Sequence, residues 1–150
     1  MLFRSIRKAN KFDLFDCVEM MRCYAQESPI EALKDTTKHD DKHVEAILFS
    51  LIAGRGFILI DEELRGFVAA VIIPNIWCPQ VKEVKELAWW VHKEHRNKLV
   101  GGKLLLAFDK EASQLVKEGR AHIVSASLMG HKINLDRLGF KQIDSTYVKE

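Results

Sequence analysis

Cysteine is scarce in this sequence, and so are long apolar runs. The three cysteines, Cys17, Cys23 and Cys78, are an odd number without a CxxC spacing, so the sequence predicts neither a disulfide framework nor a metal site. A reducing compartment, the cytoplasm, is therefore the expected location. The longest apolar stretch, residues 67–73, is far too short to cross a bilayer, and the N-terminus lacks the apolar segment of a signal peptide. We expect no membrane association.

An excess of charge of one sign is also missing. Lys and Arg number 23 against 21 for Asp and Glu, which gives a formal net charge of +2. That balance disfavours a protein whose main role is to bind the nucleic-acid backbone. The chain has 150 residues, 47% of them hydrophobic, and neither a repeat nor a linker divides it. These properties predict one globular domain spanning residues 1–150.

Hydrophobic periodicity predicts ten elements in the order β-α-α-β-β-β-α-β-α-β. The expected strands cover residues 2–7, 57–60, 66–73, 85–91, 123–126 and 142–148, and the expected helices cover residues 13–25, 41–52, 100–117 and 133–138. Residues 30–38 show no clear period and are expected to form a connection. A right-handed crossover should make residues 86–91 and 123–126 neighbouring parallel strands. The fold class is therefore α/β, a mixed sheet with helices on both faces.

Residues 91–105 carry the clearest chemical signal. A strand ends there, a basic loop follows, and a helix begins at Gly101 and Gly102. The first amides of a helix lack internal acceptors and carry the positive end of the helix dipole, and glycine leaves them open to an anion. Arg96 and Lys98 add positive charge beside them. This pattern predicts a phosphate site; the alternative is that the glycines serve only close packing of helix on sheet.

The same stretch resembles a known family. Arg96-Asn97-Lys98-Leu99-Val100-Gly101 is similar to the Arg/Gln-x-x-Gly-x-Gly/Ala loop that binds acetyl-CoA in the GNAT superfamily of N-acetyltransferases. Leu138-Gly139-Phe140 resembles the Leu-Gly-Phe after the family's fourth helix, and Ile6-Arg7-Lys8-Ala9 resembles its opening. Two positions depart from the pattern. Leu99 stands where the family usually has the first loop glycine, and Leu135 stands where it often has a tyrosine that acts as general acid.

The resemblance implies a GNAT-like fold, acetyl-CoA as cosubstrate and no metal. Backbone groups near the end of the 86–91 strand would hold the pantetheine and the thioester, and the loop would hold the pyrophosphate. Asn134 is a further implied contact, although it could equally be a solvent-facing helix residue. The implied cofactor-binding set is Trp90, Val91, Arg96, Asn97, Lys98, Leu99, Val100, Gly101, Gly102 and Asn134.

Catalysis by direct attack of an amine requires a base, because the acceptor must lose a proton. Glu86 is the best candidate, since the family often carries a glutamate on this strand. A slip or a bulge decides which face it occupies, and the alternative is a surface charge. Tyr147 on the expected last strand is a weaker candidate for the acid. The adjacent Trp89 and Trp90 should point to opposite faces of the sheet.

Two functions from different classes remain open. One is an acetyl-CoA-dependent N-acetyltransferase acting on a primary amine of a small molecule or a protein, which Arg96, Gly101 and Glu86 favour. The other is a GNAT-fold module that binds coenzyme A without efficient transfer, which Leu99 and Leu135 favour. The expected partners are acetyl-CoA and an amine acceptor, not nucleic acid, and the resemblance allows a homodimer. The segments 30–38 and 74–84, which would form the acceptor pocket, carry no diagnostic motif.

Overall fold

The computed structural model describes residues 5–96, 99–128 and 134–150. Its centre is a five-stranded sheet in the order β1-β2-β3-β4-β5. The strands are β1 (Ile6–Lys8), β2 (Gly56–Asp61), β3 (Gly66–Pro74), β4 (Lys82–Val91) and β5 (Ile123–Ser125). The first four are mutually antiparallel, and β5 lies parallel to β4. The predicted mixed sheet, the β2–β3 hairpin and the parallel pair are thus confirmed.

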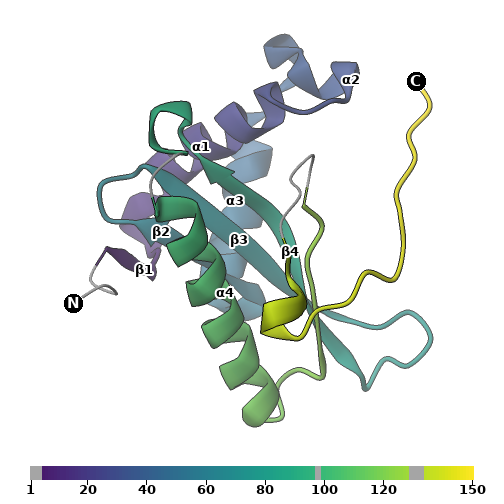
Figure 1. Ribbon diagram of the computed structural model, residues 1–150. Coiled ribbons are helices and arrows are strands. Elements are labelled where there is room, and N and C mark those ends of the chain that lie inside the picture. The colour runs from purple at the N-terminus through teal and green to yellow at the C-terminus, as the bar shows by residue number, and fades with distance from the viewer. Residues whose placement is uncertain (1–4, 97–98, 129–133) are drawn as a thin grey trace.

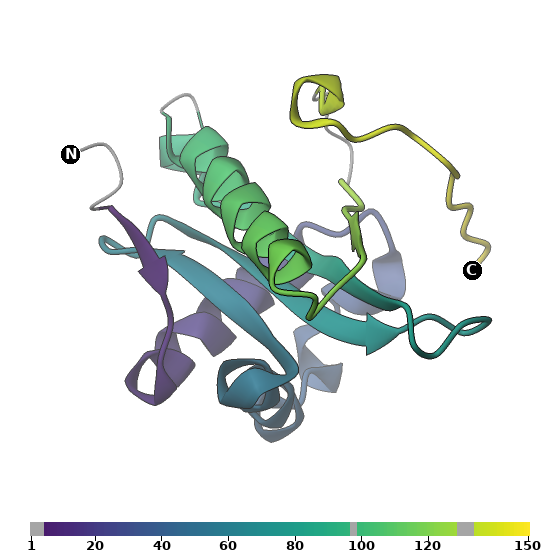
Figure 2. The same ribbon diagram turned by 90° about the horizontal axis from the view of Figure 1, so that it is seen from below.

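Helices cover both faces of this sheet. α1 (Leu14–Gln26) and α3 (Asp41–Ser50) pack on one face, and α4 (Val100–Lys117) packs on the other, as Figures 1 and 2 show. The segment predicted to lack regular structure contains α2 (Glu31–Lys34) and a short 3-10 turn, η2 (Thr36–Lys38). The remaining short elements are η1 (Lys11–Asp13), η3 (Leu51–Arg55), η4 (Lys93–His95) and η5 (Asp136–Leu138).

The apolar residues of α4 follow the helical period and explain its place in the fold. Val100, Leu104, Phe108, Ala112 and Leu115 are buried and form one stripe against the sheet. None of the helices formed by the described residues combines the length and the apolar character that crossing a bilayer requires.

Gly56 marks a point where only glycine fits. A Cβ on this residue would lie 2.0 Å from the carbonyl oxygen of Ala70 on β3. The start of β2 can therefore approach β3 closely only because residue 56 has no side chain.

The predicted final strand is wrong. Residues 140–150 have no regular structure, and the side chains of Ile143 and Tyr147 are 80% and 92% exposed. Figure 1 shows this C-terminal segment leaving the sheet and ending near α2, where the Glu150 carboxylate accepts hydrogen bonds from the backbone amides of Glu31 and Ala32. An alternating pattern permits a strand but does not supply a partner for it, and here the segment's end is bound elsewhere. The described part of the predicted 133–138 helix forms only η5.

Candidate active site

The sheet opens between β4 and β5. β5 pairs with Glu83, Val84 and Lys85, and β4 then continues to Val91 without a neighbouring strand on that side, as far as the described residues show. The amide of His92 donates to the Arg65 carbonyl oxygen on the β3 side at 2.7 Å. Because hydrogen-bonding direction alternates along a strand, the backbone groups of Val91 face the opening.

A β-bulge at Leu87 sets the orientation of the side chains around this opening. Ala69 of β3 pairs with Ala88, but Ala70 pairs with Glu86, so Leu87 is the extra residue. The bulge reverses the alternation of β4. Val84 belongs to the core under α4, whereas Ala88 and Trp90 belong to the core under α1 and α3.

Trp89 and Trp90 then take opposite faces, as the sequence predicted. Trp90 packs in the core on the α1 side, and Trp89 packs against the core on the α4 side.

Glu86 lies where the two strands separate. Glu86 is 4% exposed, and its Oε2 accepts a hydrogen bond at 3.1 Å from the amide of Ser127, a residue just beyond the end of β5. Burial raises the pKa of this carboxyl to about 7, although the Ser127 amide and the charge of Lys85 act in the opposite direction. Such a group gains and releases protons near neutral pH, which is the property of a general base.

Tyr24 on α1 is near enough to respond to this carboxyl. Burial raises the pKa of Tyr24, and the negative charge of Glu86 raises it further. Nothing in the sequence spacing joins Tyr24, Glu86 and Ser127, which come from three different segments.

The first turn of α4 has glycine at two positions, Gly101 and Gly102. Leu99, 73% exposed, precedes the helix with φ −72°, a value that any residue can adopt, so leucine in place of glycine causes no backbone strain. A Cβ on Gly101 would lie 3.4 Å from the Trp89 ring and 3.5 Å from the Val91 side chain, which is ordinary contact, and a Cβ on Gly102 would meet nothing within 4 Å. The protein's own packing therefore does not require glycine at either position.

Comparison with known proteins identifies the fold to which this geometry belongs. No protein-family model matches the chain, and no curated protein sequence is significantly similar to it. Solved structures do match. A possible acetyltransferase from Clostridium difficile aligns with TM-score 0.65 at 14% identity, covering 97% of this chain and 95% of its own. Ribosomal-protein-alanine N-acetyltransferase from Brucella melitensis aligns with TM-score 0.59 at 17% identity, covering 97% and 98%.

A third structure was solved with a ligand. Aminoglycoside N-acetyltransferase AAC(6')-Iy, in complex with CoA, aligns with TM-score 0.65 at 16% identity, covering 97% of this chain and 92% of its own. This chain has the GNAT acetyltransferase fold. The GNAT resemblance inferred from residues 96–101 and 138–140 is thereby confirmed at the level of the fold.

Arg96 occupies the first position of the GNAT-like loop, but its guanidinium is turned toward α1. Its Nη2 donates to both carboxylate oxygens of Glu27 at 2.7 and 2.6 Å, and its Nε donates to the Val91 carbonyl oxygen at 2.9 Å. The indole N–H of Trp90 donates to the same Glu27 carboxylate. Glu27 was not among the residues predicted from sequence, and no motif identifies it. Asn97 and Lys98 lie outside the described residues.

Two other predicted site residues lie in surface positions. The exposed Asn134 side chain accepts a hydrogen bond from the Asp136 amide at 2.9 Å, just before η5. Tyr147 belongs to the exposed C-terminal segment rather than to a strand beside β5. The structure therefore does not bring Tyr147 into the sheet opening that contains Glu86.

The η4 turn carries a group of metal-ligating side chains that the sequence analysis did not single out. Ligand atoms of His92, Glu94 and His95 all lie within 4.8 Å of one another. The backbone amide of Glu94 already donates to His92 Nδ1 at 3.4 Å, and Lys93 and Arg96 flank the turn with positive charge. These neighbours disfavour a bound cation.

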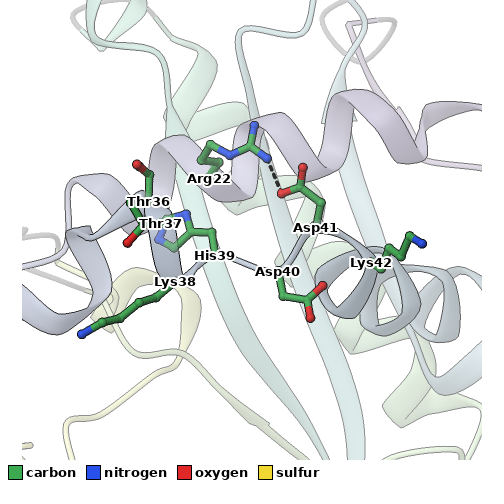
Figure 3. A pocket seen from close by; sticks show the side chains of 8 residues that line it. All are labelled: Arg22, Thr36, Thr37, Lys38, His39, Asp40, Asp41 and Lys42. Atoms are coloured by element: carbon green, nitrogen blue, oxygen red, sulfur yellow. Dashed lines mark hydrogen bonds and ion pairs between the residues drawn. The ribbon is translucent and has the colours of Figure 1, made fainter.

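An open polar pocket lies between α1 and the start of α3 (Figure 3). Thr36, Thr37 and Lys38 belong to the 30–38 segment that was expected to form the acceptor pocket, whereas none of the predicted catalytic or cofactor-binding residues lines this pocket. Its lining residues are Arg22, Thr36, Thr37, Lys38, His39, Asp40, Asp41 and Lys42.

Proposed function

We propose that the protein is an acetyl-CoA-dependent N-acetyltransferase that transfers acetyl to a primary amine of a small molecule or a protein by direct attack. The observation that carries this proposal is Glu86, a buried carboxyl with a pKa of about 7 at the point where β4 and β5 separate. The GNAT fold supports it, and so does the CoA bound to AAC(6')-Iy.

Acetyl-CoA would bind along the open edge of β4. The backbone near Trp90 and Val91 would hold the pantetheine and the thioester, and an amide aimed at the thioester oxygen would stabilise the oxyanion that develops during attack. The pyrophosphate would sit on the first turn of α4, where Val100, Gly101 and Gly102 present backbone amides at the positive end of the helix dipole.

Glu86 would take a proton from the acceptor ammonium, directly or through one water. The neutral amine then attacks the thioester carbonyl carbon, a C–N bond forms, the C–S bond breaks, coenzyme A leaves as a thiolate, and the nitrogen releases its second proton to water as the amide forms. A thiol has a pKa of roughly 8.5, so the thiolate can take a proton from water at neutral pH. The tyrosine that often supplies this proton in the family is replaced by Leu135, and Tyr147, the remaining candidate from sequence, is 92% exposed.

The test has two steps. Isothermal calorimetry with acetyl-CoA should show binding. Incubation with a panel of small amines and peptides with free N-termini should then give thiol release that depends on the acceptor.

Leu135 favours one second candidate, a CoA-binding module without efficient transfer. Binding without thiol release for any acceptor would select that candidate, and absence of binding would refute both.

A further inference from the structure

The side chain of Arg96 has a different environment from that of a phosphate ligand. Its Nη2 is shared by the two oxygens of Glu27, and its Nε is bound to the Val91 carbonyl oxygen. We propose that Arg96 does not bind the phosphates of coenzyme A but acts with Glu27 as a brace, which fixes the end of β4 beneath the first turn of α4. This inference rests on the proposed function, because it concerns how the same cofactor site is held in shape.

The Glu27 carboxylate has three partners. Besides Arg96, the Glu27 carboxylate accepts a hydrogen bond from the Trp90 indole and has the Lys93 ammonium at 3.8 Å. Burial alone would raise the pKa of Glu27, but the hydrogen bonds from Arg96 and Trp90 outweigh it, so the pKa is lowered and the group stays ionised. If Arg96 turned toward a phosphate, this partly buried carboxylate would lose its ion-pair contacts with the guanidinium, at 2.6 and 2.7 Å.

The brace reaches the cofactor site through Val91. The Val91 carbonyl, held by Arg96, belongs to the strand end that faces the sheet opening. The Val91 side chain lies under the first turn of α4, 3.5 Å from where a Cβ of Gly101 would stand. Displacing Arg96 would therefore disturb the strand end and the helix turn together, whereas Glu27 caps the C-terminus of α1.

The two roles of Arg96 predict effects of opposite sign for one substitution. If Arg96 is a brace, Glu27→Gln weakens coenzyme A binding about tenfold or more, because the guanidinium loses its anchor. If Arg96 is a phosphate ligand, Glu27→Gln leaves affinity unchanged or tightens it, because the guanidinium is freed for the pyrophosphate. Calorimetric titration of coenzyme A into the wild type and this variant measures the sign directly.

A double-mutant cycle adds a second criterion. With a brace, Arg96→Gln weakens binding by about as much as Glu27→Gln, and the double variant is no worse than either single one, since all three lose the same contact. With a phosphate ligand, the loss comes from Arg96→Gln alone. Arg96→Lys separates the roles again, because lysine can contact a phosphate but cannot donate in a fork to Glu27 and Val91 together. A brace predicts that Arg96→Lys binds as weakly as Arg96→Gln.

The matched control is another ion pair of α1. Arg22 of α1 is paired with Asp41 at the start of α3 (Figure 3), so Asp41→Asn removes an ion pair between α1 and another element, away from β4. Its coenzyme A affinity should equal that of the wild type. Should Glu27→Gln fail to fold, the comparison of Arg96→Lys with Arg96→Gln decides alone.

The outcomes separate the brace from the proposed function. A wild-type protein that does not bind coenzyme A refutes the proposed function and the brace with it. A wild type that binds, together with a Glu27→Gln variant that binds as tightly or more tightly, or an Arg96→Lys variant that retains wild-type affinity, overturns the brace and leaves the proposed function standing.

Discussion

Replacing Glu86 with glutamine tests the base with little change of shape. The amide oxygen of Gln can still accept the Ser127 N–H that Glu86 accepts at 3.1 Å, so the local structure should persist. What disappears is the proton acceptor. General-base catalysis contributes about 10²–10⁴-fold, and we expect kcat to fall by that factor while the affinity for acetyl-CoA stays nearly unchanged.

The pH dependence of turnover gives a second test of Glu86 as the base. Burial raises the pKa of Glu86 from 4.5 to about 7, so the wild-type rate should rise as pH increases through about 7 and then level off. The residual rate of Glu86→Gln should lack that rise. Thiol release measured from pH 5.5 to 9 at saturating acetyl-CoA and a fixed acceptor checks both.

The same pKa predicts a change in stability. Between pH 4.5 and about 7 the folded protein holds a proton on Glu86 that the unfolded chain has lost, so the free energy of unfolding falls as pH rises through this window. The difference in pKa corresponds to about 3 kcal/mol, all of which has been lost above pH 7. Urea unfolding of Glu86→Gln should lack this slope and should show the variant to be the more stable protein at pH 8.

Two results would refute this reasoning. An unchanged rate for Glu86→Gln would mean that the carboxyl is not the base. A wild type and a variant whose unfolding free energies change in parallel from pH 4.5 to 8 would mean that Glu86 is not desolvated. Tyr147→Phe, which alters a 92% exposed residue, should match the wild type in both assays.

Four further predictions concern three glycines and the reactivity of two cysteines. Gly101→Val should weaken coenzyme A binding at least tenfold and lower the free energy of unfolding by about 1–3 kcal/mol, because the larger side chain overpacks against β4. Gly102→Ala, whose Cβ meets no atom within 4 Å, should raise the free energy of unfolding by up to about 1 kcal/mol. Calorimetry and urea unfolding test both variants, and a Gly101→Val protein with wild-type affinity would place the phosphates elsewhere. Gly56→Ala should destabilise by at least about 2 kcal/mol, since its Cβ would overlap a β3 carbonyl, and an unchanged urea midpoint would contradict the close strand approach. Cys17 is buried, and burial raises its pKa to about 12, so it should resist a thiol reagent that labels the exposed Cys78. Mass spectrometry of the native protein after short labelling tests this, and equal labelling of the two cysteines would contradict the burial of Cys17.

Local pattern determined much of this fold. The helical period of α1, α3 and α4, the β2–β3 hairpin and the parallel neighbours β4 and β5 could be predicted because periodicity and crossover handedness constrain each of them. The sequence also pointed to the glycines at the start of α4, which lie in or next to the GNAT-like motif, and to the glutamate of β4, since the family often carries a glutamate on this strand.

Long-range contact decided the rest. The bulge at Leu87 appears only when β4 pairs with β3, and it fixes which core each later side chain enters. The alternation of residues 142–148 resembled a strand, yet a strand requires a partner, and the segment ends at α2 instead. From the sequence alone, Arg96 is predicted to be a cation beside a phosphate site. Its partner Glu27 lies 69 residues away in sequence, and only the packing of α1 beside the end of β4 brings the carboxylate within hydrogen-bonding distance of that guanidinium.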